Sequence, residues 1–215
     1  MRITALEQQA HNPERFNLFV DDRFLLGISA ELMLTQRLHI GQELSAEELD
    51  QLQYAEARQQ AIERSINYLS YRPRSTTEVR RYLRKKETPA EIIESVIEHL
   101  QRLEYINDQA FASFWVENRE QFNPKGSQAL RSELSTKGID REIIEELVDG
   151  EQDEELALRA GRKKALQLVQ DADIDFTKFR NRLGGFLQRR GFSYQVISRT
   201  VRALWQELRV EQAEE

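Results

Sequence analysis

The stretch VRRYLRKKETPAEIIESVI, residues 79–97, recurs twice further along the chain. The related stretches are LRSELSTKGIDREIIEELV at 130–148 and LGGFLQRRGFSYQVISRTV at 183–201, and the three align without a gap. Columns that are apolar in every copy include Val79, Leu130 and Leu183; Leu83, Leu134 and Leu187; and the pairs at 92–93, 143–144 and 196–197. Offsets of 51 and 53 residues between the copies predict tandem structural repeats.

Each copy predicts two helices joined by a tight turn, because its apolar residues recur every three or four positions. The turns fall at Thr88-Pro89, Lys137-Gly138 and Arg190-Gly191, and glycine after a helix is a common stop signal. A further amphipathic helix precedes each copy, at 46–71, about 108–122 and about 152–170. In the second of these helices we expect a buried stripe of Ala110, Phe111, Phe114 and Trp115. The unit is three helices, repeated three times.

The first 45 residues have a different pattern. The apolar runs RFNLFV and RFLLGI are separated by Asp21-Asp22, which predicts a hairpin, and RITALEQQ is a candidate third strand. A short helix is expected at about 30–38. The fold class is therefore mainly α: three tandem three-helix repeats in an elongated array, with a small N-terminal β-hairpin segment. The expected boundaries are 1–45 for the hairpin segment, 46–106, 107–150 and 151–209 for the repeats, and 210–215 for an acidic tail.

Composition limits the classes of protein to consider. The chain has 215 residues, 40% hydrophobic and 32% charged, and no cysteine, which excludes disulfides and cysteine-based zinc sites. The first residues lack the apolar core of a secretory signal, and no apolar run approaches the roughly 20 residues that span a bilayer. We expect a cytoplasmic monomer without membrane contact.

Charge is unevenly distributed along the chain, whose formal net charge is −6. Residues 87–155 carry 18 acidic and 6 basic side chains, a net of −12, whereas residues 159–202 carry 11 basic and 3 acidic ones, a net of +8. The stretch RPRSTTEVRRYLRKK, residues 72–86, holds seven basic residues and one acidic residue, Glu78. Such asymmetry suggests faces with different partners.

On a helical wheel, the basic residues of 76–86 separate from the apolar ones. Val79 and Leu83 lie on one face with Tyr82, and the opposite face carries Arg80, Arg81, Arg84 and Lys85. Ser75 and Glu78 form a capping box, which leaves Arg72 and Arg74 just before the helix. The third repeat has a similar pattern: Phe176, Phe179, Leu183 and Leu187 are expected to face inward, and Lys178, Arg180, Arg182, Arg189 and Arg190 outward. The middle repeat is weaker, with Lys125, Arg131 and Lys137.

A run of charge is commonly just a solvated helix face. Here, however, the helix lacks glutamates four residues away from its cations, the clustering recurs between repeats, and much of the remaining chain is acidic. These features favour binding of a polyanion such as nucleic acid, and an acidic partner protein would serve equally well. The aromatic residues, Tyr82 included, mostly lie on apolar stripes, which favours a role in the core over base stacking.

The loop NPKGSQ, residues 123–128, has two interpretations. Lys125 beside the backbone N–H groups of a helix N-terminus would form an anion site. Alternatively, Pro and Gly simply shape the loop and Ser127 caps the helix, and this second interpretation is favoured when the loop is taken alone. The Gly184-Gly185 pair inside a helix suggests close packing or a bend.

Catalytic motifs are absent from the sequence. The three histidines, His11, His39 and His99, lie in unrelated segments without metal-ligand spacing, and no nucleophile or phosphate-loop pattern occurs. We therefore expect no catalytic residues, no metal site, no cofactor and no enzymatic activity.

The segment YINDQAFASFWVENR at 105–119, followed by NPKGSQALRSELSTKGID at 123–140, resembles the RecX regulators of bacterial RecA recombinase. The resemblance extends over three three-helix units from about residue 60 to 208. It implies a protein that binds the RecA–DNA filament and modulates, with inhibition expected, the ATPase, coprotease and strand-exchange activities of the recombinase. Single- or double-stranded DNA is an expected partner.

Charge clustering supplies the candidate contact residues, two of which, Lys125 and Arg131, also lie on the family-like segment. They are Arg72, Arg74, Arg80, Arg81, Arg84, Lys85, Lys125, Arg131, Arg180, Arg182, Arg189 and Arg190. Two alternatives stay open at this point: a helical DNA- or RNA-binding module without a recombinase partner, and an adaptor whose basic faces meet acidic protein.

Overall fold

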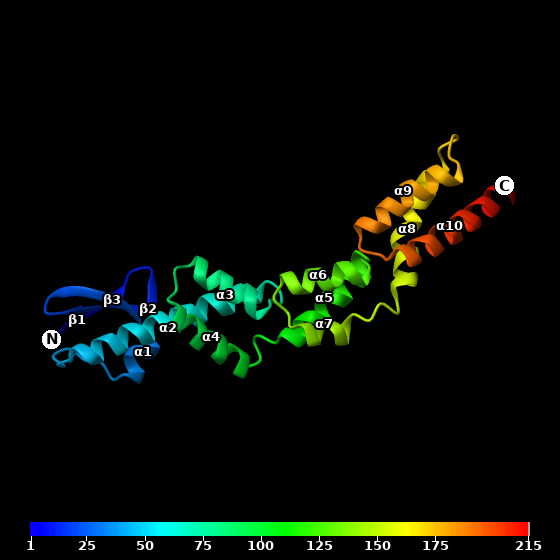
Figure 1. Ribbon diagram of the computed structural model, residues 1–215. Coiled ribbons are helices and arrows are strands. Elements are labelled where there is room, and N and C mark those ends of the chain that lie inside the picture. The colour runs from blue at the N-terminus through cyan, green and yellow to red at the C-terminus, as the bar shows by residue number, and fades with distance from the viewer. Residues whose placement is uncertain (215) are drawn as a thin grey trace. The chain divides into compact units, whose positions relative to one another are not determined.

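The computed structural model describes the backbone of residues 1–214 and the side chains of residues 1–209. Figure 1 shows a β-sheet near the N-terminus followed by helices. The strands are β1 (Ile3–Gln9), β2 (Asn12–Val20) and β3 (Arg23–Ser29). The helices are α1 (Ala30–Thr35), α2 (Ala46–Ser70), α3 (Thr76–Lys85), α4 (Ala90–Arg102), α5 (Asp108–Phe122), α6 (Ser127–Thr136), α7 (Arg141–Leu147), α8 (Asp153–Val169), α9 (Phe176–Arg189) and α10 (Tyr194–Glu214). The mainly helical fold with three three-helix repeats is confirmed.

The chain forms two compact units. Unit 1 comprises residues 1–72 and 79–105, and unit 2 comprises residues 73–78 and 106–215. The acidic tail expected at 210–215 has no separate structure where the backbone is described, because α10 continues to Glu214. Glu215 and the side chains of 210–214 lie outside the described residues.

The N-terminal segment is a three-stranded antiparallel sheet in the order β1-β2-β3, so the candidate third strand is present. Asp21 and Asp22 connect β2 to β3 with φ values of +47° and +61°. Two successive positive φ values are the requirement of the type I′ turn, which aspartate tolerates better than most residues. The buried face of the sheet carries Ile3, Leu18 and Ile28, all 0% exposed, and packs against Leu44 and Leu52 of the following segment.

A buried carboxylate, Glu56 of α2, ties this helix to the sheet. It accepts hydrogen bonds from the Arg15 guanidinium at 2.6 Å, from the Ser29 backbone N–H at 3.1 Å and from the Gln60 side-chain amide at 2.9 Å. Glu56 is only 3% exposed, and a buried charge is tolerated when its hydrogen-bonding capacity is filled in this way. The hairpin segment is thereby fixed to the first helix of repeat 1.

The equivalence of the repeats holds in the core. Leu83, Leu134 and Leu187, which share one column of the alignment, are all 0% exposed. The turns are equivalent too, because the left-handed residue that ends the middle helix is Glu87 in repeat 1 and Gly138 and Gly191 in the others, with φ of +60°, +76° and +82°. Repeat 1 makes this turn without glycine, one residue before the predicted Thr88-Pro89.

The buried stripe of α5 differs from the expected one. Phe111, Ala112 and Val116 are buried and Trp115 is half-buried, whereas Ala110 and Phe114 are exposed, Phe114 by 39%. The expected stripe was therefore wrong at Ala110 and Phe114. The core of this repeat collects Phe111, Ala112 and Val116 with Leu134 of α6 and Ile144 of α7, and Ala110 and Phe114 lie outside it. In α9 the expected inward face holds for Phe179, Leu183 and Leu187, but Phe176 is 36% exposed at the edge of the core beside Trp205.

Successive repeats are joined in unit 2 by the same set of contacts. The backbone N–H of Thr76, at the start of α3, donates to the Asp108 carboxylate at 2.8 Å, and the equivalent N–H of Ser127 donates to Asp153 at 2.9 Å. Asp108 and Asp153 are the first residues of α5 and α8. Each aspartate therefore caps the middle helix of the preceding repeat, since the first N–H groups of a helix have no partner within the helix.

The turn of each following repeat completes the junction. Ser75 Oγ donates to the Lys137 carbonyl at 2.7 Å, and the N–H of Gly126, which occupies the Ser75 column, donates to the Arg190 carbonyl at 2.9 Å. The backbones approach so closely that a Cβ atom on Gly191 would lie 2.3 Å from the Cβ of Ala129. The turn glycine is therefore required both for its φ value and for the contact between repeats.

Candidate nucleic-acid interface

The basic face of α3 forms as the helical wheel predicts. The capping box is present, because Glu78 N–H donates to Ser75 Oγ at 3.2 Å and Ser75 N–H donates to the Glu78 carboxylate at 3.4 Å. Val79 and Leu83 are 0% exposed and fix the inward face, so Arg81, Arg84 and Lys85 project to solvent. Within the described residues these three side chains make no hydrogen bond or salt bridge. They form the exposed basic face of α3, a positive surface available to an anionic partner.

Arg80 differs from its neighbours because it has a carboxylate partner on α4. Its Nε and Nη2 atoms donate to the two oxygens of Glu94, both at 2.8 Å. The hydrogen bond from Arg80 lowers the pKa of Glu94, with smaller contributions from the charges of Arg80 and Arg84. Arg80 is therefore neutralised by a carboxylate of the neighbouring helix α4.

Arg72 and Arg74, just before α3, are half-buried. Both already interact with other groups of the chain. They add positive charge close to the start of the helix, but their side chains are less available than Arg81, Arg84 and Lys85.

Aromatic rings adjoin the basic face of α3. Tyr82 stacks on Tyr68 of α2 with ring centroids 4.2 Å apart and planes inclined by 6°, and the Lys86 ammonium lies 5.9 Å from the Tyr82 centroid. Tyr71, at the end of α2, is 77% exposed. The prediction that Tyr82 belongs to the core was wrong, because this ring is half-buried and packs on another tyrosine. Cations interleaved with aromatic rings are typical of surfaces that bind single-stranded nucleic acid.

In the middle repeat, Lys125 belongs to a network inside the repeat. The Glu133 carboxylate accepts from Lys125, from Arg119 Nε at 2.9 Å and from Trp115 Nε1 at 2.8 Å. Burial raises the pKa of Glu133, but the hydrogen bonds from Lys125, Arg119 and Trp115 together outweigh burial and lower it. Glu133 therefore already compensates the charge of Lys125. The backbone N–H of Ser127, at the start of α6, is not available for an anion either, because it donates to Asp153. The N-cap is Gly126 rather than the expected Ser127.

Arg131 also has a structural contact. Its Nε and Nη2 atoms donate to the Val148 carbonyl at 3.1 and 2.6 Å, which satisfies a free carbonyl at the C-terminal end of α7. The structure therefore places both candidate residues of the middle repeat in contacts that stabilise the repeat.

In the third repeat, the candidate residues divide into two groups. Arg182 pairs with Asp171 at 3.0 Å, and Arg190 donates to Asn123 Oδ1 at 2.7 Å and to the Pro124 carbonyl at 3.0 Å. Arg180 and Arg189, on α9, are exposed and make no hydrogen bond or salt bridge within the described residues. Arg189 occupies the same column of the repeat as Lys85 on α3. An exposed cation at this helix position therefore occurs in the first and third repeats.

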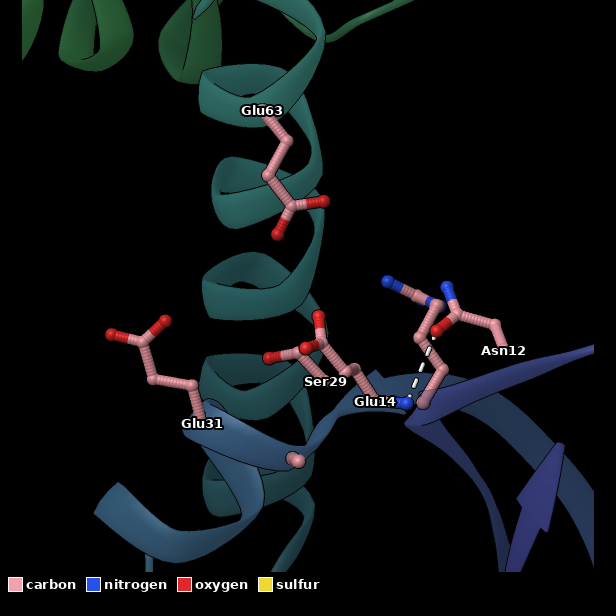
Figure 2. Close-up of a pocket in the computed structure, with 7 residues that line it drawn as sticks. Asn12, Glu14, Ser29, Glu31 and Glu63 are labelled. Carbon is pink, nitrogen blue, oxygen red and sulfur yellow. Dashed lines mark hydrogen bonds between the residues drawn. The ribbon is translucent and has the colours of Figure 1, made fainter.

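The opposite sign of charge surrounds a hollow of about 380 Å³ in unit 1. Figure 2 shows Glu14 of β2, Glu31 of α1 and Glu63 of α2 around it, together with Asn12 and Ser29. Arg15, which also lines the hollow, is bound to Glu56. Three carboxylates repel phosphate, so this hollow does not belong to a nucleic-acid surface.

Sequence interpretation missed the exposed Tyr71 and the half-buried Tyr68, which stacks on Tyr82. A signal was present, since both tyrosines come just before the basic stretch 72–86. No helix among residues 1–214 is both long and apolar enough to cross a bilayer, and no three His, Asp or Glu side chains of this part of the chain are placed to hold a metal ion.

Comparison with known proteins gives consistent matches along the chain. The family model described as "Regulatory protein RecX N-terminal domain" matches residues 1–45, and the models for the first, second and third RecX three-helix domains match 61–100, 107–148 and 151–201.

Similar proteins support the same assignment. "Regulatory protein RecX" of Bacillus subtilis is 36% identical over 91% of this chain and 74% of its own length, and that of Bacillus pumilus is 33% identical over 99% and 81%. A crystal structure of regulatory protein RecX superposes with a TM-score of 0.69 at 24% identity, covering 92% of this chain and 97% of its own. RecX from Lactobacillus salivarius gives 0.61 at 28% identity, covering 70% of this chain and 97% of its own. The chain belongs to the RecX family of regulatory proteins.

Proposed function

We propose that this protein binds the RecA–DNA filament and lowers the ATPase, coprotease and strand-exchange activities of the recombinase. Membership of a family of regulatory proteins supports a regulatory role, and the resemblance at 105–119 and 123–140 supports RecA as its target. The protein acts in the cytoplasm as a monomer and regulates by occupying the filament, without chemistry of its own.

The observation that carries this proposal is the exposed basic face of α3. Arg81, Arg84 and Lys85 stand on one helix face and make no salt bridge with any side chain that the structure describes, although the chain as a whole has a net charge of −6. Exposed cations without carboxylate partners are suited to an anionic ligand, because binding replaces counter-ions and not an existing salt bridge. Arg180 and Arg189 are exposed cations of the same type on α9 of the third repeat.

Adding the purified protein to preformed filaments of RecA on single-stranded DNA tests the proposal, with the rate of ATP hydrolysis as readout. The rate should fall as the protein approaches a stoichiometric ratio to the recombinase, and the protein alone should hydrolyse neither ATP nor DNA. Higher ionic strength should weaken the inhibition, because exposed charges are screened beyond about 8–10 Å.

A stimulated rate would reverse the sign of the proposed regulation. An unchanged rate at every ratio, together with binding to bare DNA or RNA, would instead identify a nucleic-acid-binding module without a recombinase partner. An unchanged rate without nucleic-acid binding would favour an adaptor for acidic proteins.

A further inference from the structure

Two glycines of α9, Gly184 and Gly185, are not required by the packing of the helix. Neither has a positive φ value, and a Cβ atom on Gly184 or Gly185 would meet only one side-chain atom each, of Ile197 or Arg189, at an ordinary contact distance of 3.5 Å. The expectation of close packing at this pair was therefore wrong. Glycine in the interior of a helix is less favourable than alanine. The presence of two glycines here therefore needs another explanation.

The missing side chains leave a groove of about 610 Å³ on unit 2. One face of α9 forms its floor, with Arg180, Gly184 and Gln188 spaced by four residues and Asn181 beside Gly185 in the same way. The first turn of α10 and Gln128 of α6 form the other walls. A side chain on either glycine would enter this groove.

The chemistry of the groove selects its ligand. Phe192, 2% exposed, and Ile197 supply apolar lining, while Gln128, Asn181 and Gln188 supply amides that donate and accept hydrogen bonds. Tyr194, which also lines the groove, is 86% exposed, and Arg180 is an exposed lining residue that makes no salt bridge within the described residues. Among residues 1–209, whose side chains are described, no carboxylate lines the groove. The amides can hydrogen-bond the edge of a nucleotide base, the exposed ring can stack on its face, and the Arg180 guanidinium can bind the phosphate.

The position of the groove within its repeat agrees with this choice. Gly184, Gly185 and Gln188 occupy the alignment columns of Arg80, Arg81 and Arg84 on α3. The same face of the middle helix is therefore basic in the first repeat and hollow in the third. A duplex has its base faces stacked and its pairing edges occupied, so only an unpaired base can enter a hollow of this kind.

We infer that this groove, the Gly184–Gly185 groove, binds one unpaired base of single-stranded nucleic acid, with Tyr194 stacking on the base and Arg180 contacting an adjacent phosphate. The inference rests on the proposed function in taking nucleic acid as a partner. It adds a site, a strand preference and one new contact residue, Tyr194, and it assigns the candidate residue Arg180 to a phosphate.

The test measures binding of a fluorescently labelled single strand of about 20 nucleotides, and of the corresponding duplex, to the full-length protein without recombinase. Tyr194→Ala removes the stacking ring, and Gly185→Gln fills the groove with an uncharged side chain that favours a helix. Phe122→Ala, which removes a ring that is 72% exposed on α5, and Ala203→Gln, which adds the same side chain to an exposed position of α10, are the matched controls.

Both groove variants should bind the single strand at least about 5-fold more weakly, which corresponds to the lower end of base-stacking energies. Duplex binding, helical circular dichroism and both controls should change less than about 2-fold. Arg180→Ala should also reduce the slope of log K against log salt by about 0.7, as expected for one phosphate contact, whereas Tyr194→Ala should leave the slope unchanged.

Three results would overturn the inference. If the groove variants bind the single strand like the wild type, the groove is not used for nucleic acid. If they bind the strand normally but no longer inhibit the filament ATPase, the groove holds a segment of the recombinase. If the wild type binds no single strand yet inhibits the filament, the base-binding groove is contradicted and the proposed function is not. Failure of the proposed function would be seen separately, as a lack of inhibition of the filament ATPase.

Discussion

Ser127 and Asp153 are joined by two hydrogen bonds, one from the Ser127 backbone N–H at 2.9 Å and one from its hydroxyl at 2.8 Å. Asp153 is 6% exposed, so its removal leaves two donors of Ser127 without their acceptor. This contact links the second repeat to the third, and the single bond from Thr76 to Asp108 is its counterpart at the preceding junction. The repeats are therefore joined by capping between helices as well as by apolar packing.

Asp153→Ala should lower the free energy of unfolding of unit 2 by about 1–3 kcal/mol, the usual cost of leaving buried donors unsatisfied. Chemical denaturation followed by circular dichroism measures this loss. Asp140→Ala is the matched control, since Asp140 precedes α7 without a side-chain capping bond, and it should cost less than about 0.5 kcal/mol. Equal losses for the two variants would contradict a capping role for Asp153.

The equivalent leucines of the three repeats should respond alike to truncation. Leu83→Ala, Leu134→Ala and Leu187→Ala each remove a side chain that is 0% exposed and should each cost about 2–5 kcal/mol of stability. Denaturation midpoints of the three variants provide the measurement. Leu166→Ala, on an exposed position of α8, is the control and should be nearly neutral. A neutral result at any one of the three would show that its repeat lacks the common core.

The turn glycines and the groove glycines should respond to alanine with opposite signs. Gly191→Ala places a side chain at φ +82° and 2.3 Å from Ala129, so it should destabilise by more than about 2 kcal/mol. Gly184→Ala introduces a Cβ at an ordinary contact distance inside a helix and should stabilise by about 0.5–1 kcal/mol. Thermal unfolding of both variants measures the difference. Destabilisation by Gly184→Ala would mean that the helix needs this glycine for its own packing.

The Glu133 network gives a pH dependence with a definite sign. The folded protein lowers the pKa of Glu133 below its ordinary value of 4.5, so the ionised carboxylate contributes stability that is present above pH 4.5. This contribution is lost as the pH falls through the folded-state pKa. The wild type should exceed Glu133→Gln in unfolding free energy by about 1–3 kcal/mol at pH 7, and the difference should shrink below pH 4.5. A difference that grows on acidification would contradict the direction of the shift.

Features that depend on local sequence were predicted well. The repeat columns, the middle helices, the capping box at Ser75 and the outward face of α3 follow from spacing alone, because helix periodicity fixes which side chains share a face. The Asp21-Asp22 turn follows in the same way from residue types that tolerate positive φ.

Features that depend on contacts between helices were not predictable in this way. Glu94 neutralises Arg80 from 14 residues away, and Glu133 of α6 binds Arg119 of α5 and Lys125 of the intervening loop. Pairing of this kind depends on how helices cross, which no local pattern specifies. The Gly184-Gly185 pair is compatible with a bend, a close contact or an open groove, and only the positions of the neighbouring helices distinguish these.

Binding of the protein to RecA filaments on single-stranded DNA, measured against salt concentration, tests most directly whether the exposed basic face of α3 holds the filament. Arg81, Arg84 and Lys85 are changed together to Ala, and Arg23, Lys163 and Arg202, exposed cations outside this face, are changed together as the control for lost net charge. Helical circular dichroism should be unchanged in both. The α3 variant should bind more weakly, and its slope of log K against log salt should be smaller by about 2, as expected when three cations no longer meet phosphates. Wild-type affinity and slope in the α3 variant, or an equal loss in the control, would contradict a specific role for this face.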